Sequence, residues 1–394
     1  MPHQHASTLY IQDEVGLKVL CERLRESDRL ALDTEFMGED TYAPRLEIIQ
    51  VATDDLIAIV DRRAVPGLNG FLELLTAPNI LKIVHAGRQD LEIFSVEGGS
   101  ISPVFDTQVA AAMVGYGTQI GYGQLVLQVV GVSLDKTETF TNWAQRPLTA
   151  EQLDYAKEDV RYLFALHAHL RDRLKALGRV EWAEEEFQRL QAVSGEEARA
   201  PQLRYQRIRG WEGLRPRARG VLRELAVWRE HEAHKRDRPR GRVLRDDVLL
   251  EIARRGPTTL EGLRSLRGVQ PSQVDKYGES LVTAIQRGLS VPDRDLPRAE
   301  KRKRVDPESA GLADLLGTAL KVRAIEASIS PQLLASSADL EVFALERGRG
   351  EAEKLPILQG WRRALAGEHL REVMEGKLTV GYDPETGQVK LFAR

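Results

Sequence analysis

Residues 30–36 read LALDTEF, an apolar run that ends in two carboxylates separated by one residue. Side chains in a β-strand alternate between its two faces, so Asp33 and Glu35 project from the same face. Neighbouring carboxylates repel each other unless a cation lies between them, and hard divalent ions such as Mg²⁺ prefer oxygen ligands. Because 29% of the chain is charged, such triplets also arise by chance, and an exposed strand edge stays an alternative.

Short apolar runs and helical patterns alternate around this stretch. The runs at residues 30–36, 47–52, 56–61 and 81–85 predict strands, and the spacing at 89–96, 107–114 and 149–177 predicts helices. The last of these helices begins with Thr149 and Gln152 in capping-box register. The first three strands lie close enough together to form hairpins, so we expect an α/β domain with a mixed sheet.

Strand patterns disappear after about residue 181, and helical patterns then dominate to about residue 376. The layout of residues 205–291 recurs after the linker at 297–307, at an offset of about 90 residues, which predicts two small all-α domains. Residues 377–392 predict a terminal hairpin. We therefore expect domains over residues 1–200, 201–295 and 296–394.

The net charge of −3 conceals two halves of opposite sign. Residues 1–200 contain 19 basic and 31 acidic side chains, whereas residues 201–394 contain 37 and 28. This asymmetry indicates nucleic-acid binding, although solvated helix faces would give the same pattern. The second half is rich in arginines that suit phosphate binding, among them Arg204, Arg207, Arg217, Arg223, Arg240 and Arg245, whereas Trp228 fits an apolar stripe and is assigned to the core.

Several classes of protein are not expected from the composition. No apolar stretch approaches the roughly 18 residues of a membrane span, and no charged-then-apolar leader is recognisable, so a soluble cytoplasmic protein is expected. The single cysteine, Cys21, excludes an intramolecular disulfide and a thiolate zinc cluster. No Gly-Lys-Ser/Thr phosphate loop is present.

Other carboxylates follow in order along the chain. Asp90 comes after a glycine turn in the stretch HAGRQDLEIF at 85–94, in a helical first turn where the helix dipole alone could explain it. Asp106 precedes the helix at 107 and is assigned to N-capping. Tyr155 and Asp159 are four residues apart and share one side of a helix, so a hydroxyl and a carboxylate can converge there.

These segments together resemble a known family. DTEF at 33–36, HAGRQDLEIF at 85–94, and the run from LDK at 134–136 through Trp143 to Tyr155 and Asp159 match in order the three exonuclease motifs of the DEDD superfamily. The first 180 residues resemble the ribonuclease D family, tyrosine subgroup, and the basic half resembles an HRDC domain followed by a more divergent copy. The resemblance implies a ribonuclease H-like mixed sheet with flanking helices, followed by two small HRDC-type domains.

The resemblance also implies an activity, namely 3′→5′ exoribonuclease cleavage that releases nucleoside 5′-monophosphates by two-metal-ion hydrolysis. It assigns the two divalent ions, Mg²⁺ or Mn²⁺, to Asp33, Glu35 and Asp159, with Asp90 supporting them through water. Ions about 3.5 to 4 Å apart can stabilise both the attacking and the leaving oxygen. Tyr155 would orient the attacking water, since a phenol with an unperturbed pKa near 10 is a poor base at neutral pH.

Substrate contacts are expected from seven further residues: Phe36, Met37, Gln50, His85, Arg88, Lys136 and Arg146. The first two would stack on or wedge against the terminal bases, and the three basic side chains would contact phosphate. Gln50 could reach the 3′ terminal sugar or simply occupy a strand face, and His85 could be a hydrogen-bonded histidine at a strand end. Trp143 fits the core as well as a substrate contact.

The family resemblance implies RNA with a single-stranded 3′ end as the partner, with tRNA precursors as the expected substrates, and no obligate protein partner is expected. The motifs themselves do not name RNA, so a 3′→5′ DNA exonuclease is a second hypothesis. A third is a non-catalytic RNA-binding scaffold, in which the carboxylates only stabilise the fold and the basic helices bind.

Overall fold

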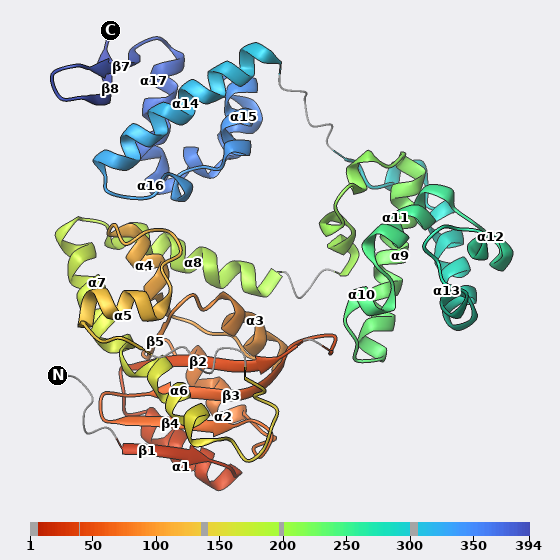
Figure 1. Cartoon of the computed structure of the whole chain (residues 1–394), viewed down its shortest axis with the longest axis horizontal. Coiled ribbons are helices and arrows are strands. Elements are labelled where there is room, and N and C mark those ends of the chain that lie inside the picture. The colour runs from red at the N-terminus through yellow and green to blue at the C-terminus, as the bar shows by residue number, and fades with distance from the viewer. Residues whose placement is uncertain (1–6, 39, 135–140, 197–200, 300–305) are drawn as a thin grey trace.

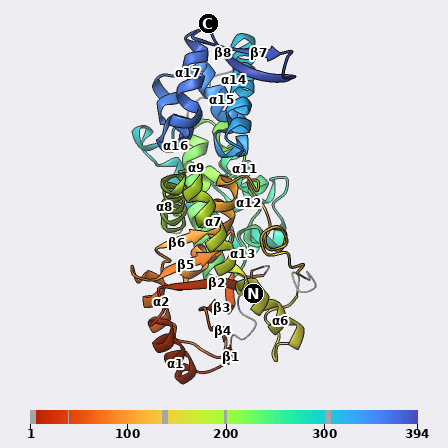
Figure 2. The same cartoon turned by 90° about the vertical axis from the view of Figure 1, so that its left-hand side faces the viewer.

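The computed structural model describes residues 7–38, 40–134, 141–196, 201–299 and 306–394. Figure 1 shows an α/β domain at the lower left, a helical bundle on the right and a second helical unit at the upper left. Figure 2, turned by 90°, places the second helical unit above the α/β domain. No helix in these ranges is long and apolar enough to cross a membrane.

The α/β domain is built on a six-stranded sheet with the order β1-β4-β3-β2-β5-β6. The strands are β1 (Ser7–Ile11), β2 (Arg29–Met37), β3 (Arg45–Ala52), β4 (Leu56–Asp61), β5 (Leu81–Val84) and β6 (Val104–Asp106). β3 runs antiparallel to β2 and β4, and the other neighbours are parallel. The expected hairpins and mixed sheet are therefore confirmed, whereas the half-exposed β1 and the three-residue β6 were not predicted.

Helices cover both faces of the sheet. Leu30 and Leu32 face one layer, made by α1 (Glu14–Leu24), α2 (Asn69–Thr76) and α3 (Arg88–Val96). Ala31 and Ile83 face the other layer, made by α4 (Thr107–Met113), α5 (Tyr122–Val130), α6 (Ala150–Arg161) and α7 (Leu163–Ala176). By alternation along β2, Asp33 and Glu35 belong to the second face.

The single helix predicted over residues 149–177 is wrong in one respect, because it breaks at Tyr162 into α6 and α7. The Tyr122 hydroxyl donates to the Glu158 carbonyl at 2.8 Å and accepts from the Tyr162 amide at 3.2 Å. An uninterrupted helix would join this carbonyl and this amide directly, so the inserted hydroxyl breaks the ladder. The predicted capping box of Thr149 and Gln152 is confirmed.

The helical bundle has its own apolar core, which includes Trp228 as predicted. It contains α9 (Pro216–Lys235), α10 (Arg240–Val243), α11 (Asp246–Arg255), α12 (Leu260–Arg264) and α13 (Pro271–Leu289). Short 3₁₀ turns flank these helices at Pro201–Arg207, Trp211–Gly213 and Asp293–Asp295.

The second helical unit contains α14 (Pro307–Glu326), α15 (Ser337–Leu345), α16 (Gly360–Arg362) and α17 (Glu368–Met374), with a π-turn at Arg363–Gly367. Its 3₁₀ turns are Pro331–Leu333, Gly350–Lys354 and Pro356–Leu358, and β7 (Leu378–Asp383) pairs with β8 (Gln388–Ala393) in the predicted hairpin. The starts of α14 and α9 are 91 residues apart (307 minus 216), as are those of α15 and α11 (337 minus 246), in agreement with the expected repeat.

Both helical units contact the α/β domain. The Arg179 guanidinium, at the start of α8 (Val180–Glu196), donates to the carbonyls of Met113 and Ala327 at 2.7 Å each, and the Trp182 and Trp361 rings stack with centroids 5.1 Å apart. These contacts extend the apolar core of the second sheet face into the C-terminal unit.

Residues 197–200 and 300–305 lie outside the described ranges, so the limits 1–200, 201–295 and 296–394 stay predictions.

A tight turn between β5 and α3 places Asp90. The Asp106 carboxylate accepts from the amides of Ala86 at 3.1 Å and Gly87 at 2.9 Å, in addition to capping α4 as predicted. A Cβ atom on Gly87 would lie 2.5 Å from Cγ2 of the buried Val84 side chain. Glycine is therefore required for the chain to pass this close to the strand it has just left.

We expect Gly87→Ala to destabilise the protein by about 1 to 3 kcal/mol, because the added methyl group overpacks the turn. Urea unfolding measures the change. Gly311→Ala in α14 is the matched control, since a Cβ there meets nothing within 4 Å and alanine favours the helix. Equal stability of the two variants would contradict the assigned role of the turn.

Candidate active site

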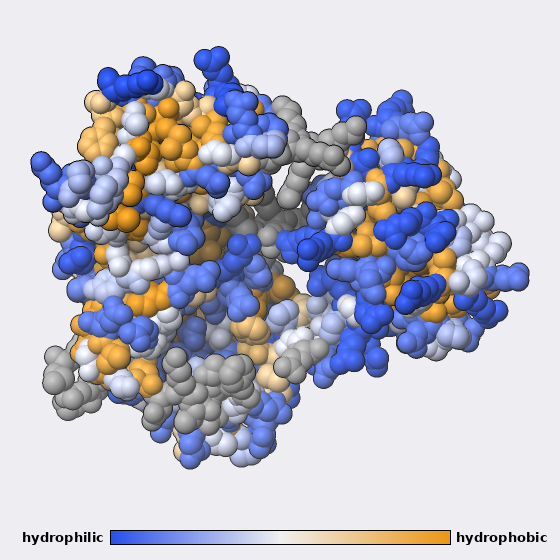
Figure 3. Space-filling model, turned by 45° about the horizontal axis from the view of Figure 1, so that its top comes forward, coloured by the Kyte–Doolittle hydropathy of each residue, from blue (hydrophilic) through white to orange (hydrophobic). Residues whose placement is uncertain are grey.

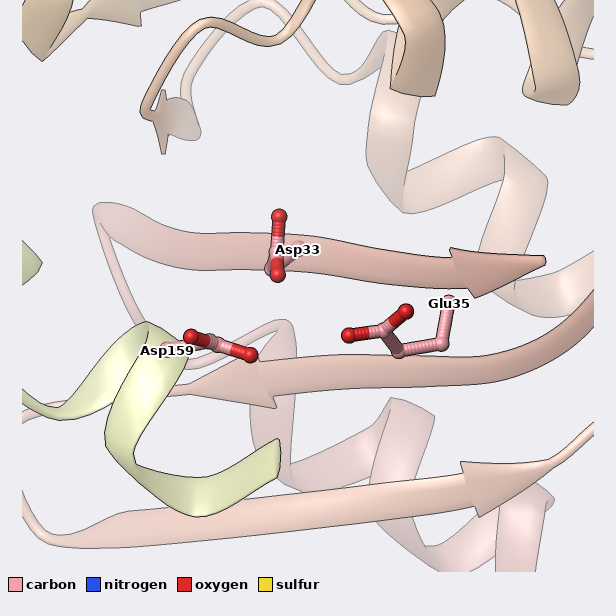
Figure 4. A group of neighbouring side chains, drawn as sticks. All are labelled: Asp33, Glu35 and Asp159. Atoms are coloured by element: carbon pink, nitrogen blue, oxygen red, sulfur yellow. The ribbon is translucent and has the colours of Figure 1, made fainter. Parts of the chain in front are cut away.

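Three carboxylates gather on the second face of the sheet. Asp33 and Glu35 extend from β2 and Asp159 from α6, and each contributes an oxygen atom that lies within 4.8 Å of those of the other two. Figure 4 shows the carboxylates of Glu35 and Asp159 turned toward each other, with Asp33 beside the gap between them. The two segments that form this cluster lie more than a hundred residues apart in the sequence, as the motif spacing predicted.

A bulge interrupts the strand pairing beside this cluster. Glu35 pairs with Ile48, but the next residue, Phe36, pairs with Leu46, so Glu47 is the extra residue on β3. Bulges bend a strand and redirect the side chains that follow it. As a result, Leu46 packs in the core of the first face, although Ile48, two residues further along β3, lies on the second face. The alternation of β2 continues past the bulge, so Phe36 packs on the first face and Met37 on the second, near Trp143.

Asp90 lies next to the cluster rather than within it. Its side chain is 7% exposed and accepts a hydrogen bond from the Thr34 hydroxyl, which lies between Asp33 and Glu35 in the sequence. The Asp90 carboxylate is not one of the mutually close oxygens, yet its charge acts on both Asp33 and Glu35. This position is compatible with the support through water that the family resemblance implies for Asp90.

The site is unfavourable for ionised carboxylates without a cation. Burial, followed by the charges of Asp90, Asp159 and Glu35, raises the pKa of Asp33 well above its usual range. Burial, then Asp159 and Asp90, raises the pKa of Glu35 to about 8. Burial is also the largest cause that raises the pKa values of Asp90 and Asp159 to about 7.

The donor set suits a hard divalent cation. It offers only carboxylate oxygens, and Oδ2 of Asp159 is buried without a hydrogen-bond partner. Mg²⁺ and Mn²⁺ prefer such oxygen ligands. A cation between Asp33, Glu35 and Asp159 would therefore offset both their desolvation and their mutual repulsion.

Two aromatic side chains flank the carboxylates. Tyr155 lies one helical turn before Asp159 on α6, and its ring centroid is 6.1 Å from that of Trp143. Trp143 is 2% exposed and packs against Ile48 and Ile59, so it belongs to the core. The position of Tyr155 is compatible with the predicted orientation of a water molecule.

The remaining predicted contacts differ in their surroundings. Arg88 is exposed at the start of α3, and its Nε lies 3.3 Å from a carboxylate oxygen of Glu92. Phe36 and Met37 are half-buried. Lys136 lies outside the described residues. Gln50 is completely buried on the second face of the sheet and does not reach the surface.

His85 and Arg146 are engaged within the protein. The His85 ring nitrogens lie 2.9 Å from the Thr107 hydroxyl and 3.0 Å from the Ile120 carbonyl, which favours the hydrogen-bonded strand-end histidine over a substrate contact. The Arg146 guanidinium donates to both Asp61 carboxylate oxygens, at 2.6 and 2.7 Å, and to the Trp143 carbonyl at 2.7 Å. The structure thus favours a structural role for Arg146, which fixes the segment that carries Trp143.

Sequence reasoning missed three residues that place the carboxylates. The Thr34 hydroxyl donates a hydrogen bond to Asp90. The Asp106 carboxylate accepts hydrogen bonds from the two amides of the turn that precedes Asp90. The Tyr122 hydroxyl fixes the backbone on either side of Asp159. A polar side chain on a buried strand face was the available signal for Thr34. No local pattern indicated the long-range contacts of Asp106 or Tyr122.

In chelator, we expect the free energy of unfolding to fall as pH rises from about 5 to about 8. In the folded state the pKa values of Glu35 and Asp159 are raised to about 8 and 7, whereas carboxyl groups of the unfolded chain ionise near pH 4. The folded state therefore binds more protons than the unfolded state in this window, and the free energy of unfolding decreases as the pH rises toward the folded-state pKa values. Excess Mg²⁺ should remove this loss, since a cation replaces the protons. Urea unfolding across the pH range measures this loss. The control Glu35→Gln should make the metal-free profile shallower, because one of the raised carboxyl groups is removed. A flat wild-type profile would contradict the assignment.

Comparison with known proteins agrees with this geometry. The sequence profile of the 3′-5′ exonuclease family matches residues 9–175, and that of the HRDC domain matches residues 218–285. Ribonuclease D of Granulibacter bethesdensis is 38% identical over 98% of this chain and 96% of its own length. Ribonuclease D of Sphingobium indicum is 37% identical over 97% of both chains.

A solved structure extends the similarity to the whole fold. The crystal structure of Escherichia coli RNase D, described as an exoribonuclease involved in structured RNA processing, matches with a TM-score of 0.84 and 30% identity, covering 94% of this chain and 99% of its own. The fold class and the family expected from the motifs are thereby confirmed. The chain belongs to the ribonuclease D family of 3′→5′ exoribonucleases.

Proposed function

We propose that this exoribonuclease trims the 3′ ends of structured RNAs, with tRNA precursors as its substrate class, and releases nucleoside 5′-monophosphates. The observation that carries the proposed chemistry is the cluster of Asp33, Glu35 and Asp159, whose oxygens lie within 4.8 Å of one another. The substrate class rests on the family relationship and on the structured-RNA processing ascribed to the E. coli enzyme. The expected cytoplasmic location stays a prediction.

Each residue of the cluster has a role in this proposal. Asp33, Glu35 and Asp159 would hold two divalent ions, Mg²⁺ or Mn²⁺, and Asp90 would support them through water. Bound ions would neutralise charge on the attacking and leaving oxygens and lower the pKa of the attacking water. Tyr155 would form one hydrogen bond with that water and so fix the direction of its attack on the phosphorus atom.

A cavity between the α/β domain and the helical bundle, beside the loop that follows Phe36, offers a path for the RNA. It has a volume of about 360 Å³ and lies between Phe36 and Glu92 on the α/β domain and Arg204, Arg207 and Arg240 on the bundle side. Aromatic rings stack on bases and arginines bind phosphates, so this lining suits a single strand. Figure 3 shows that the surface of the bundle is largely hydrophilic, as a phosphate-binding surface requires.

The wall of this cavity is fixed by contacts between the domains. The Tyr42 hydroxyl donates to the Glu230 carboxylate at 2.8 Å, and the Tyr42 amide donates to Asp237 at 3.2 Å. The Arg240 guanidinium lies over the Tyr42 ring, 4.6 Å from its centroid. The loop that joins β2 to β3 is therefore held against the bundle, and Phe36, just before this loop, lines the same cavity as the arginines.

The main test is a time course on a 5′-labelled RNA with a short single-stranded 3′ tail, with Mg²⁺, with Mn²⁺ and with chelator. We expect a metal-dependent ladder that shortens from the 3′ end, and a loss of at least a hundredfold in rate for Asp33→Asn, because that change removes a ligand charge. RNA affinity should persist in this variant. Bound but uncut RNA with either metal would favour the scaffold hypothesis instead.

The same time course separates RNA from DNA. A DNA strand of identical sequence and tail differs in lacking the 2′-hydroxyl groups that allow a protein to recognise RNA. We expect the RNA to be shortened faster than the DNA. Equal or faster cleavage of the DNA would favour the DNA exonuclease hypothesis.

A second prediction concerns the cavity. The double variant Arg204→Ala/Arg207→Ala should weaken binding of a single-stranded RNA and lower the slope of log affinity against log salt by about 1.4, since each phosphate contact on a single strand contributes about 0.7. Fluorescence anisotropy at several salt concentrations, in the Asp33→Asn background, measures both quantities. Arg254→Ala/Arg255→Ala on α11 is the control, because these exposed arginines pair with Glu251 and do not line the cavity. Equal slopes for the two double variants would exclude the proposed path.

A further inference from the structure

Gln50 lies on the second face of the sheet, on the strand next to the one that carries Asp33 and Glu35. It is in the middle of β3, where it pairs with Asp33 of β2 on one side and Ile59 of β4 on the other. Side chains of directly paired residues lie on the same face of a sheet, so the side chains of Gln50 and Asp33 are neighbours on this face. Ile48 and Ile59 of this face pack against Ala156 of α6, which places Gln50 beneath the helix that carries Asp159.

The amide group of Gln50 has no partner in the described structure. Its side chain is 0% exposed, and neither Oε1 nor Nε2 makes a hydrogen bond. Apart from Asp33, the neighbouring positions on this face, Ile48, Ala52 and Ile59, are apolar. A buried amide without hydrogen bonds costs free energy that an apolar side chain of the same size would not.

A second polar atom on this side of the sheet is also buried without a hydrogen-bond partner. Oδ2 of Asp159 is buried and accepts no hydrogen bond. Buried polar groups that lack partners in a free protein are found where a ligand or a network completes them. Both atoms lie on the side of the sheet where the three carboxylates gather, and Gln50 offers two donors and one acceptor there.

We propose that Gln50 is a positioning residue for the metal site: its NH₂ group orients the carboxylate of Asp33, which would hold the metal ion. The inference rests on the metal-dependent function proposed above. Ligands of a metal ion are commonly oriented by a second layer of hydrogen bonds. Because Gln50 is completely buried, it acts through Asp33 and does not touch the terminal sugar of the substrate.

The test compares Gln50→Met with Ile48→Met, a control two residues away on the same strand face. Methionine is close to glutamine in volume and shape but cannot donate a hydrogen bond. Calorimetric titration with Mn²⁺ should show affinity 10- to 100-fold weaker in Gln50→Met, and affinity unchanged in Ile48→Met. The steady-state kcat on RNA should fall in Gln50→Met while KM for the RNA stays the same.

Thermal unfolding in chelator gives a readout that a purely structural role would not produce. Without metal, Gln50→Met should unfold at the same or a higher temperature than the wild type, because an unpaired buried amide has been removed. The rise in unfolding temperature on adding Mn²⁺ should be smaller than in the wild type. A residue held only for the fold would show the opposite pattern.

Two results would overturn the inference. One is wild-type Mn²⁺ affinity in Gln50→Met, and the other is a clear loss of metal-free stability in both Gln50→Met and Gln50→Leu. Failure of the underlying function looks different, because the wild type itself would then bind no Mn²⁺ at this site and would leave RNA uncut.

Discussion

Repulsion between partly buried carboxylates is the constraint on which this structure depends. Asp33 and Glu35 share a strand face, Asp159 approaches them from α6, and burial together with their mutual charges raises their pKa values. A protein gains no stability from such a cluster while the groups are ionised. The arrangement becomes favourable when a divalent cation replaces the protons, so the same interactions that destabilise the metal-free site provide the affinity for metal.

The rest of the α/β domain keeps these groups from separating. β2 lies between β3 and β5 in the middle of the sheet and cannot relax outward. The Tyr122 hydroxyl, inserted between Glu158 and Tyr162, fixes the backbone around Asp159. Thr34 holds Asp90 from the opposite face of β2. Contacts of the β2–β3 loop with Glu230 and Asp237 then relate the site to the arginines of the helical bundle.

The sequence predicted the chemistry of the site better than its supports. Period-2 alternation sufficed to place Asp33 and Glu35 together, and a four-residue helical spacing sufficed for Tyr155 and Asp159, because both rules are local. The break at Tyr162 could not be predicted, since it depends on a hydroxyl forty residues away in sequence. Arg146 was expected at phosphate for its charge, but its partner Asp61 lies 85 residues away and is recognisable only in three dimensions. Short or half-exposed elements such as β6 and β1 carry too little apolar pattern to be seen.

Diffraction from crystals soaked in Mn²⁺ tests the central claim most directly, because anomalous scattering locates each manganese ion independently of the protein phases. We expect two peaks in the wild type, with oxygens of Asp33, Glu35 and Asp159 at ligand distance, and Gln50 turned toward Asp33. Peaks that lie elsewhere, or a carboxylate cluster that stays metal-free at saturating Mn²⁺, would contradict the account and leave the gathered carboxylates without a physical explanation.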